Sequence, residues 1–287
     1  MRKKRILIFG ATGMAGHVVY HYLNSSEKYE IFNSVFREEL TKDSFITDVT
    51  DRKAVYKLIN TVDPDFIINC VGILVKGSKN YPDNAILLNA YFPHLLKRYA
   101  DEIGAKLVHI STDCVFSGDK GDYQEDDFRD ADDVYGRSKA LGEIINDKDL
   151  TIRTSIVGPE IKKNGEGLFH WFMKQHGTIN GYTNAYWGGI TTVELAKVIE
   201  LSIDNGLTGL VHVTNGEKIS KYDLLLLFKK YWNKSDIELV KSEDVKQDKS
   251  LKASKRYNFN VPSYPVMLRE MAEWMSLYAD LYLQYKV

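Results

Sequence analysis

The sequence predicts an α/β protein with a doubly wound parallel sheet, followed by a smaller C-terminal lobe of mixed α/β structure. Three observations indicate this class. Over residues 5–155, short runs rich in β-branched residues alternate with amphipathic stretches of helical period, which is typical of βαβ units. A glycine-rich turn directly follows the first run, and beyond residue 156 the alternation becomes irregular. We therefore expect two units, residues 1–156 and 157–287, with segments of the second returning to the first.

Each expected element is a periodic or apolar run bounded by turn signals. In the first unit we expect strands at 5–9, 30–35, 65–71, 106–111 and 150–155, and helices at 14–24, 52–60, 84–103 and 134–146. In the second unit we expect helices at 165–175, 192–204 and 220–232, one short strand at 209–213, and a terminal helix or helix pair at 267–284. The charged stretch 241–255 has no apolar periodicity, so a solvated loop or an exposed helix is expected there.

The composition argues against several classes of function. The 287 residues are 44% hydrophobic, which is enough for the core of a globular enzyme. With 38 basic and 39 acidic residues the net charge is −1, so no field is expected that would recruit nucleic acid or an anionic membrane. No apolar run approaches the roughly 18 residues of a spanning helix. Cys70 and Cys114 lack metal-ligand spacing, so we expect no metal site and a reducing, cytoplasmic compartment.

A glycine-rich turn, Gly10-Ala11-Thr12-Gly13-Met14-Ala15-Gly16, joins the first strand to the first helix. Glycine permits a tight turn and lets backbone N–H groups at a helix start approach a pyrophosphate. We therefore expect a dinucleotide to bind here; the alternative is a turn that only packs the helix on the sheet. The expected contacts come from Gly10, Thr12, Gly13, Met14 and Gly16.

The end of the second strand indicates which dinucleotide is bound. An acidic residue there would accept hydrogen bonds from free ribose hydroxyls, whereas an arginine pairs with a 2′-phosphate. The strand ends in Ser34-Val35-Phe36-Arg37, which favours NADPH, with NADH as the alternative if Arg37 is only an exposed loop cation. Asp48 and Val49 follow at a distance that would bring them under the adenine.

Tyr135 and Lys139 are four residues apart in an expected helix, so their side chains share one face. Thr112 follows the strand 106–111, at the carboxyl edge where doubly wound sheets bind ligands. We expect Tyr135 to deliver a proton, with its pKa, ordinarily near 10, lowered by the Lys139 ammonium. Lys139 would also hold the nicotinamide ribose, and Thr112 would hydrogen-bond the substrate carbonyl oxygen.

Together these residues resemble the extended short-chain dehydrogenase/reductase family, and within it the dTDP-4-dehydrorhamnose reductase group. Besides the glycine turn, the resemblance rests on Ser111-Thr112-Asp113-Cys114-Val115-Phe116-Ser117-Gly118 and on Tyr135-Gly136-Arg137-Ser138-Lys139-Ala140-Leu141-Gly142-Glu143. It covers most of the chain. It implies a Rossmann-type fold, a nucleotide-sugar substrate, a role in polysaccharide biosynthesis and a homodimer.

The resemblance also implies further site residues. On the cofactor side they are Cys70, Val71 and Gly72 at a strand end, and Asn89 in a helix. On the substrate side they are Thr112, Asp113, Cys114, Phe116, Arg153, Ile156, His170, Tyr182 and Trp187. For the segment 167–189, which supplies the last three, the alternative is ordinary packing of the lobe.

The reaction that the resemblance implies is NADPH-dependent reduction of the 4-keto group of a nucleotide-linked 4-keto-6-deoxy sugar. Cys114 stands where the group usually has an aromatic residue, and Ile156 where it usually has a tryptophan. A UDP-linked 4-keto-6-deoxy-N-acetylhexosamine is therefore an alternative to the dTDP-linked rhamnose precursor. An NAD-dependent 4-epimerase and a non-catalytic, cofactor-binding regulatory subunit are the alternative functions. A 4,6-dehydratase is disfavoured, because Asp113 is not followed by the glutamate that water elimination needs.

Overall fold

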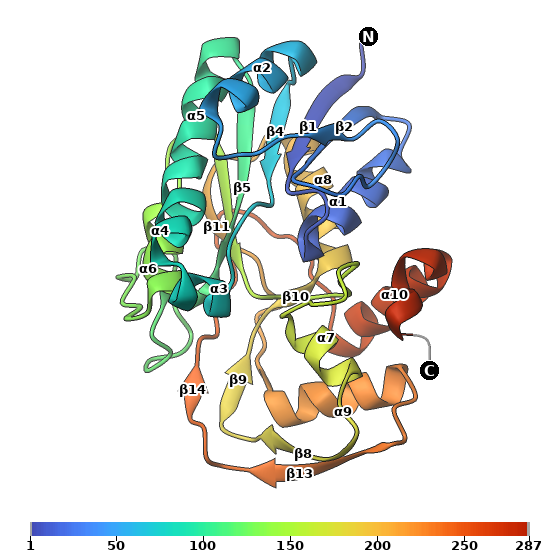
Figure 1. The fold of residues 1–287 in the computed structure, drawn as a ribbon. Coiled ribbons are helices and arrows are strands. Elements are labelled where there is room, and N and C mark those ends of the chain that lie inside the picture. Colours follow the sequence, from blue (N-terminus) through green and yellow to red (C-terminus); the bar gives the residue numbers. More distant parts are fainter. Residues whose placement is uncertain (1, 286–287) are drawn as a thin grey trace.

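Seven parallel strands form one sheet in the computed structural model, which describes residues 2–285 (Figure 1). The strand order is β11-β6-β5-β4-β1-β2-β3. From β1 the chain first adds β2 and β3 on one side, and then β4, β5, β6 and β11 on the other. The strand order therefore reverses between β1 and β4, and the sheet is doubly wound, as predicted. The strands are β1 (Lys4–Phe9), β2 (Tyr29–Val35), β3 (Phe45–Ile46), β4 (Phe66–Asn69), β5 (Lys106–Thr112), β6 (Leu150–Thr154) and β11 (Gly209–His212).

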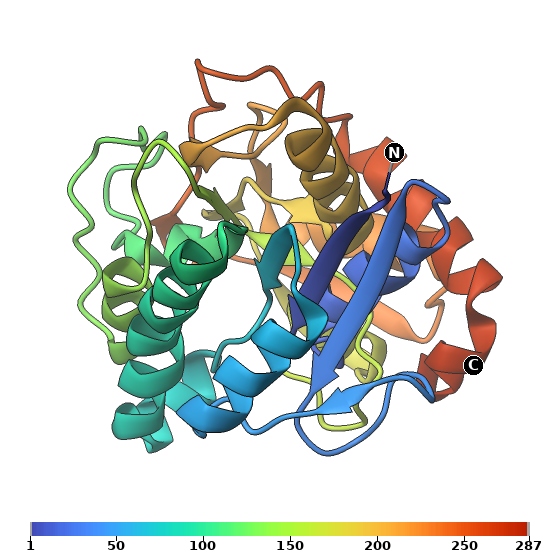
Figure 2. The ribbon, with the colours of Figure 1, turned by 90° about the horizontal axis from the view of Figure 1, so that it is seen from above.

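Helices cover both faces of this sheet (Figure 2). Side chains of β1 alternate between two buried clusters, with Ile6 and Ile8 on the face of α1, α8 and α10, and Leu7 and Phe9 on the face of α2 and α5. Because both faces are buried, the strand is a continuous apolar run. These helices are α1 (Met14–Asn24), α2 (Arg52–Val62), α5 (Phe92–Ile103), α8 (Thr192–Asn205) and α10 (Tyr264–Leu277). Within residues 2–285, no helix combines the length and apolarity needed to cross a bilayer.

The connection from β4 to β5 is more interrupted than the single helix expected there. It consists of α3 (Val75–Asn80), α4 (Pro82–Ala85), a π-helical turn η1 (Ile86–Tyr91) and α5. Of these segments, α3 and α4 lie near the edge at which β4 and β5 end, whereas α5 runs back along the face of the sheet (Figure 1).

The helix that carries Tyr135 and Lys139 is α6 (Val134–Leu141). Its N-cap is Asp133, whose carboxylate accepts a hydrogen bond from the N–H of Gly136 at 2.9 Å. Such a cap satisfies a backbone donor that the first turn leaves free. The helix ends at Leu141 rather than at the expected residue 146.

The C-terminal lobe contains small sheets that the sequence analysis did not predict. β8 (Gly177–Tyr182) pairs in parallel with β13 (Ile237–Ser242), and β9 (Ala185–Trp187) lies between β12 (Ile219–Ser220) and β14 (Gln247–Asp248). β7 (Ile156–Val157) pairs with β10 (Ile190–Thr191). The stretch 241–255, expected to be a loop or an exposed helix, is mostly loop but also holds the end of β13 and all of β14. The remaining helical elements are η2 (Asp113–Val115), α7 (Leu168–Met173), α9 (Lys221–Tyr231) and η3 (Ala279–Tyr285).

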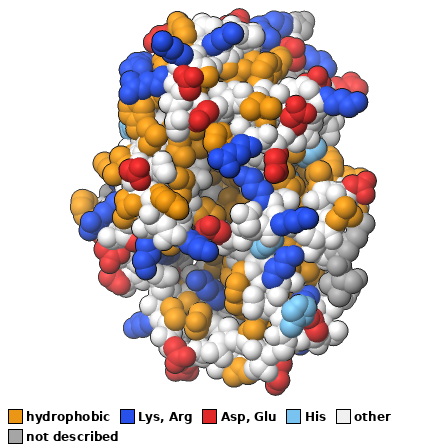
Figure 3. Space-filling view, in the orientation of Figure 1, with side chains coloured by type: hydrophobic (Ala, Val, Ile, Leu, Met, Phe, Trp, Pro, Cys, Tyr) orange, Lys and Arg blue, Asp and Glu red, His pale blue; other side chains and the backbone are white. Residues whose placement is uncertain are grey.

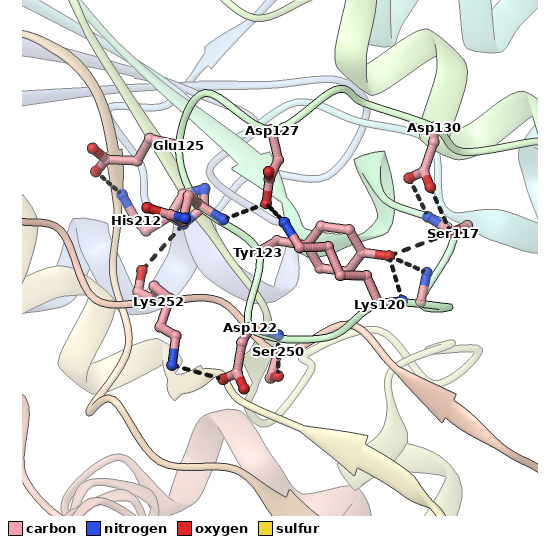
Figure 4. A network of polar contacts seen from close by, with 12 residues as sticks. Ser117, Lys120, Asp122, Tyr123, Glu125, Asp127, Asp130, His212, Ser250 and Lys252 are labelled. Carbon is pink, nitrogen blue, oxygen red and sulfur yellow. Dashed lines mark hydrogen bonds and ion pairs between the residues drawn. The ribbon is translucent and has the colours of Figure 1, made fainter.

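A polar network fixes the long loop after β5 against later parts of the chain (Figure 4). The Tyr123 hydroxyl accepts a hydrogen bond from the N–H of Gly118 at 3.1 Å, which closes the loop on itself. From β11, the N–H of His212 donates to the carboxylate of Glu125 at 2.8 Å. The loop 116–131 therefore holds a defined position beside the end of the sheet.

Candidate active site

A cavity of about 1250 Å³ opens where β1, β4, β5 and β6 end, between the sheet and the C-terminal lobe. This is the edge at which the strand order reverses, where doubly wound sheets bind ligands. Pockets for single small ligands are typically about 300–1,000 Å³, so this cavity has room for a dinucleotide and a second ligand. In the space-filling view, basic side chains gather around the hollow in the middle of this face (Figure 3).

The turn after β1 has the geometry of a pyrophosphate cradle. Gly10 has φ +79°, and a Cβ there would lie 2.9 Å from the backbone of the residue after β4. A Cβ on Gly16 would overlap the carbonyl oxygen of Gly10. Gly13 caps α1, whose first N–H groups have no partners within the helix. Thr12, Gly13 and Met14 line the cavity, so the residues present fit a bound dinucleotide.

Arg37, expected to meet the 2′-phosphate, does not line the cavity. It is exposed and comes two residues after the end of β2. The N–H of Gly10 donates to the carbonyl oxygen of Ser34 at 3.1 Å, which holds the turn against this strand end. Asp48 and Val49, also expected at the adenosine, are likewise not part of the wall. None of these three expected adenosine contacts therefore lies on the cavity wall.

Thr112, Tyr135 and Lys139 lie together on the cavity wall. Thr112 is the last residue of β5, and α6 presents the other two side chains to the same space. The Lys139 ammonium donates a hydrogen bond to the carbonyl oxygen of Ile110 at 2.6 Å. The Thr112 hydroxyl donates to the Asp113 carboxylate at 3.0 Å. The structure therefore brings the three expected catalytic side chains to one place.

Burial sets the acid–base state of both groups on α6. Burial raises the pKa of Tyr135 above its ordinary value, and the nearby Thr112 hydroxyl only partly opposes the rise. Burial lowers the pKa of Lys139 to about 8, against the opposing effect of the Glu143 carboxylate. The expectation that the ammonium lowers the phenol pKa is therefore wrong for this arrangement, in which the ammonium is bonded to a backbone carbonyl.

Residues 70–72 line the cavity as expected, whereas Asn89 does not. The Asn89 side-chain oxygen accepts from the N–H of Ile73 at 2.8 Å, and its side-chain nitrogen donates to the Ile73 carbonyl at 3.0 Å. The same nitrogen donates to the Ser138 hydroxyl at 3.1 Å. Because its side chain is used in this way, Asn89 joins the segment after β4 to α6 and holds the wall in place behind the cavity.

Besides Thr112, five residues expected to bind substrate line the cavity: Asp113, Cys114, Ile156, His170 and Trp187. The Trp187 indole N–H donates to the Ser155 hydroxyl at 3.0 Å, which fixes the ring on the wall. Burial raises the pKa of the Cys114 thiol to about 12. The thiol is therefore protonated near neutral pH and is not a nucleophile.

Phe116, Arg153 and Tyr182 do not line the cavity, contrary to the expectation. Tyr182 ends β8 in the C-terminal lobe. Arg153 and Phe116 are buried behind the wall, with the guanidinium carbon 5.0 Å from the ring centre. Arg153 donates two hydrogen bonds to the Glu143 carboxylate, at 2.8 and 2.7 Å. A buried cation needs such a partner, so Arg153 belongs to the core and not to the substrate site.

A group of lysines that was not predicted as part of the site lines the cavity wall. They come from α3, the loop 158–167, the end of α7 and the start of α9: Lys76, Lys79, Lys162, Lys163, Lys174 and Lys221. Among the described residues, the wall holds these six and Lys139 against three acidic side chains, Asp113, Glu160 and Glu166. Such an excess of positive charge favours a ligand with several negative charges. The adjacent pair at 162–163, within a glycine-containing loop, was the only local sequence signal.

Known proteins resemble this chain over most of its length. The family model described as RmlD substrate binding domain matches residues 4–262. A dTDP-4-dehydrorhamnose reductase of Salmonella typhimurium is 30% identical over 251 residues, which are 83% of this chain and 81% of that protein. The crystal structure of a hypothetical dTDP-4-dehydrorhamnose reductase from Sulfolobus tokodaii superposes with a TM-score of 0.75 and 30% identity, covering 87% of this chain and 92% of that one.

Two further relatives carry other names. A probable low-salt glycan biosynthesis reductase of Haloferax volcanii is 34% identical over 158 residues, which are 52% of this chain and 52% of that protein, so the match spans about half of its length. Methionine adenosyltransferase 2 subunit beta of Bos taurus is 26% identical over 235 residues, which are 77% of this chain and 70% of that protein. The relatives thus include named reductases and a protein named as a subunit.

Proposed function

Since this chain belongs to the RmlD substrate binding domain family, we propose that it is an NADPH-dependent sugar-nucleotide oxidoreductase that reduces the 4-keto group of a nucleotide-linked 4-keto-6-deoxy sugar. One observation carries the proposal. The glycine turn, the group of Thr112, Tyr135 and Lys139, and the lysine-rich wall all face one cavity of about 1250 Å³. A dinucleotide and a nucleotide sugar are both anionic, and their reacting atoms have to meet at the acid–base group.

The side chains on the wall have complementary roles in this reaction. When bound, NADPH supplies the hydride for the keto carbon. Thr112 stabilises the negative charge that develops on the keto oxygen, and Tyr135 delivers the proton that completes the alcohol. Because burial raises the pKa of Tyr135, the phenol keeps its proton until that oxygen becomes basic. The Lys139 ammonium binds the ribose hydroxyls of the cofactor.

The cofactor and the compartment are part of the proposal. NADPH is favoured over NADH because Arg37 follows the end of β2, where binding of free ribose hydroxyls would call for an acidic residue. We infer a cytoplasmic location from Cys70 and Cys114, which are both free thiols, as is usual in a reducing compartment. Polysaccharide biosynthesis is the process that the product would serve.

Both a dTDP-linked and a UDP-linked sugar are candidate substrates. Cys114 and Ile156 line the cavity at positions where the family resemblance leads one to expect larger, aromatic side chains. The smaller side chains leave space for a bulkier sugar, such as the N-acetylhexosamine of a UDP-linked 4-keto-6-deoxy substrate. The lysines on the wall favour the diphosphate that both candidates share.

A second candidate function is a cofactor-binding regulatory subunit without turnover. The 26% identity to methionine adenosyltransferase 2 subunit beta favours it. Against it, Thr112, Tyr135 and Lys139 all line the cavity beside the glycine turn, and a subunit without turnover would not need this arrangement. A 4-epimerase is disfavoured by Arg37, since an enzyme that retains NAD usually has an acidic residue at this strand end.

The test follows NADPH absorbance when the purified protein is mixed with a panel of dTDP- and UDP-linked 4-keto-6-deoxy sugars. A reductase consumes NADPH in proportion to the keto sugar and yields the 4-hydroxy sugar. An epimerase yields a sugar isomer without net loss of NADPH, and a subunit binds NADPH and does neither. NADPH binding without consumption across the whole panel would overturn the proposal. The same panel with NADH decides the cofactor, and sedimentation of the same sample tests the expected homodimer.

A further inference from the structure

We propose that the C-terminal segment η3 positions the loop 158–167 on the cavity wall, with Tyr285 as the residue that holds it. The inference rests on the proposed function, because this loop is taken to face the nucleotide sugar. The family model ends at residue 262, so the segment 279–285 lies beyond the part of the chain that the family match covers.

Tyr285 joins the loop to α7 through one buried hydroxyl. The N–H of Glu160 donates to this hydroxyl at 3.0 Å, and the hydroxyl lies 2.7 Å from Nδ1 of His170. A phenol oxygen can accept from one group while it donates to another, so both contacts are satisfied together. The ring of Tyr285 packs against Phe169, with 5.5 Å between the ring centres. The hydroxyl is therefore held in place by the core.

Gln284 holds the other side of the same loop residue. Its side-chain NH2 group donates to the carbonyl oxygen of Glu160, and the backbone carbonyl oxygen of Gln284 accepts from the Lys174 ammonium at 3.3 Å. Two consecutive residues of η3 thus bind the N–H and the carbonyl of Glu160. Glu160, His170 and Lys174 all line the cavity, so η3 supports this part of the wall from behind.

The loop itself closes around the Glu160 carboxylate. This carboxylate accepts a hydrogen bond from the N–H of Gly167 at 2.7 Å. A Cβ on Gly165 would lie 2.6 Å from it, so the backbone approaches the carboxylate as closely as glycine allows. Lys162 and Lys163 lie between these residues and line the cavity. Fixing Glu160 therefore fixes the turn that carries both lysines.

Removing the Tyr285 hydroxyl should loosen this loop. The N–H of Glu160 and Nδ1 of His170 would both lose their partner in a buried place, which favours local opening. When fewer molecules have the loop closed, the apparent affinity for the keto-sugar nucleotide falls in the same proportion. We expect Tyr285→Phe to raise KM for the keto-sugar nucleotide by about tenfold. The value of kcat should stay within about twofold, because the acid–base group lies on β5 and α6.

Tyr282→Phe is the matched control. Tyr282 is also buried in η3, but its hydroxyl bonds to His17 and Trp274 instead of the loop. Both variants are expected to lose thermal stability, and at saturating NADPH only Tyr285→Phe should show the raised KM. Gln284→Ala removes a half-buried side chain and is expected to raise KM by about threefold with little loss of stability. It therefore tests the same loop contact if Tyr285→Phe does not fold. An unchanged KM in both loop-contacting variants, or an equal rise in Tyr282→Phe, would overturn the inference.

Hydrogen–deuterium exchange separates this inference from the proposed reaction. Amides of residues 158–167 should exchange faster in Tyr285→Phe than in wild type, and at the wild-type rate in Tyr282→Phe, whether or not any keto sugar is turned over. Unchanged exchange in this loop in both Tyr285→Phe and Gln284→Ala would refute the positioning role even in an active reductase. Faster exchange in a protein without turnover supports the positioning of the loop and refutes only the reaction.

Discussion

The ammonium of Lys139 donates a hydrogen bond to the backbone carbonyl oxygen of Ile110 over a distance of 2.6 Å. Ile110 lies in β5, two residues before Thr112, so this bond holds the lysine against the strand that ends at the cavity. One carbonyl replaces only part of the hydration of an ammonium, and burial accordingly lowers the pKa of Lys139 to about 8. Near neutral pH the side chain is a cation close to its titration point.

We predict that kcat/KM for the keto sugar falls as the pH rises through about 8. A lysine with a pKa of about 8 is an ammonium below that pH and a neutral amine above it, so any step that needs the cation is lost on the alkaline side. A profile of kcat/KM from pH 6 to pH 10 checks this. Lys139→Arg keeps its charge throughout, so its residual activity should lack this descending limb. A wild-type profile that stays flat through pH 9.5 would contradict the role of Lys139.

We predict that Tyr135→Phe lowers kcat by at least about 10²-fold, the effect typical of a lost general acid. The ring stays in place, so Kd for NADPH should change by less than about twofold. Stopped-flow absorbance gives the first quantity and fluorescence titration the second. Tyr56→Phe is the control, since Tyr56 is exposed on α2 and its variant should behave as wild type. Normal turnover in Tyr135→Phe would remove the proposed acid.

The sheet and the acid–base group could be predicted because their signals are local. The run Ile6–Leu7–Ile8–Phe9 is apolar at every position since both faces of β1 are buried. Tyr135 and Lys139 share a face because a helix places residues four apart on one side. By contrast, Lys76, Lys174 and Lys221 come from separate elements, and only the tertiary fold brings them to one wall. No local pattern could have grouped them.

The errors have a related cause. Arg153 stands beside Ser111 and His212 in the sheet, but the sequence does not show that its side chain joins Glu143 in the core. The Lys139 ammonium was expected to act on Tyr135, and its bond to a backbone carbonyl could not be seen from residue spacing. In the lobe, β7, β10, β12 and β14 have two residues each, too few to display alternation.

We predict that Arg153→Met destabilises the protein by about 3 kcal/mol, the lower end of the usual effect of removing one member of a buried ion pair. The Glu143 carboxylate would keep its bond with the partly exposed Arg129 at 2.9 Å but lose the fully buried Arg153. Urea unfolding measures the change, and Arg98→Met, at an exposed position on α5, should cost less than about 0.5 kcal/mol. If Arg153→Met is as stable as wild type and instead raises KM, Arg153 binds substrate after all.

We predict different effects at two glycines of the cradle. Gly16→Ala would push a methyl group into the Gly10 carbonyl, and such overpacking typically costs about 1–3 kcal/mol of stability. Gly13 has φ −78° and ψ 169°, which alanine adopts freely, but its Cβ would lie 3.2 Å from the Gly10 carbonyl oxygen, a tight contact that is still much less severe than the one at Gly16. Gly13→Ala should therefore fold, with a smaller loss of stability than Gly16→Ala. Its methyl group would crowd a pyrophosphate and raise Kd for NADPH by about tenfold or more. Thermal melts with and without NADPH distinguish the two. A Gly13→Ala variant that binds NADPH as tightly as wild type would argue against a pyrophosphate at this turn.

We predict that Arg37→Ala lowers kcat/KM for NADPH by about 10- to 100-fold and leaves kcat/KM for NADH within about twofold, because a charge-assisted hydrogen bond to the 2′-phosphate contributes roughly 1.5–3 kcal/mol. The guanidinium is exposed, so its removal should not affect folding. Lys42→Ala removes another exposed cation from the connection between β2 and β3 and controls for a general loss of positive charge. If Arg37→Ala loses kcat/KM equally with both cofactors, the arginine does not contact the 2′-phosphate. If kcat/KM for NADPH is unchanged, other residues at the end of β2 determine the cofactor preference.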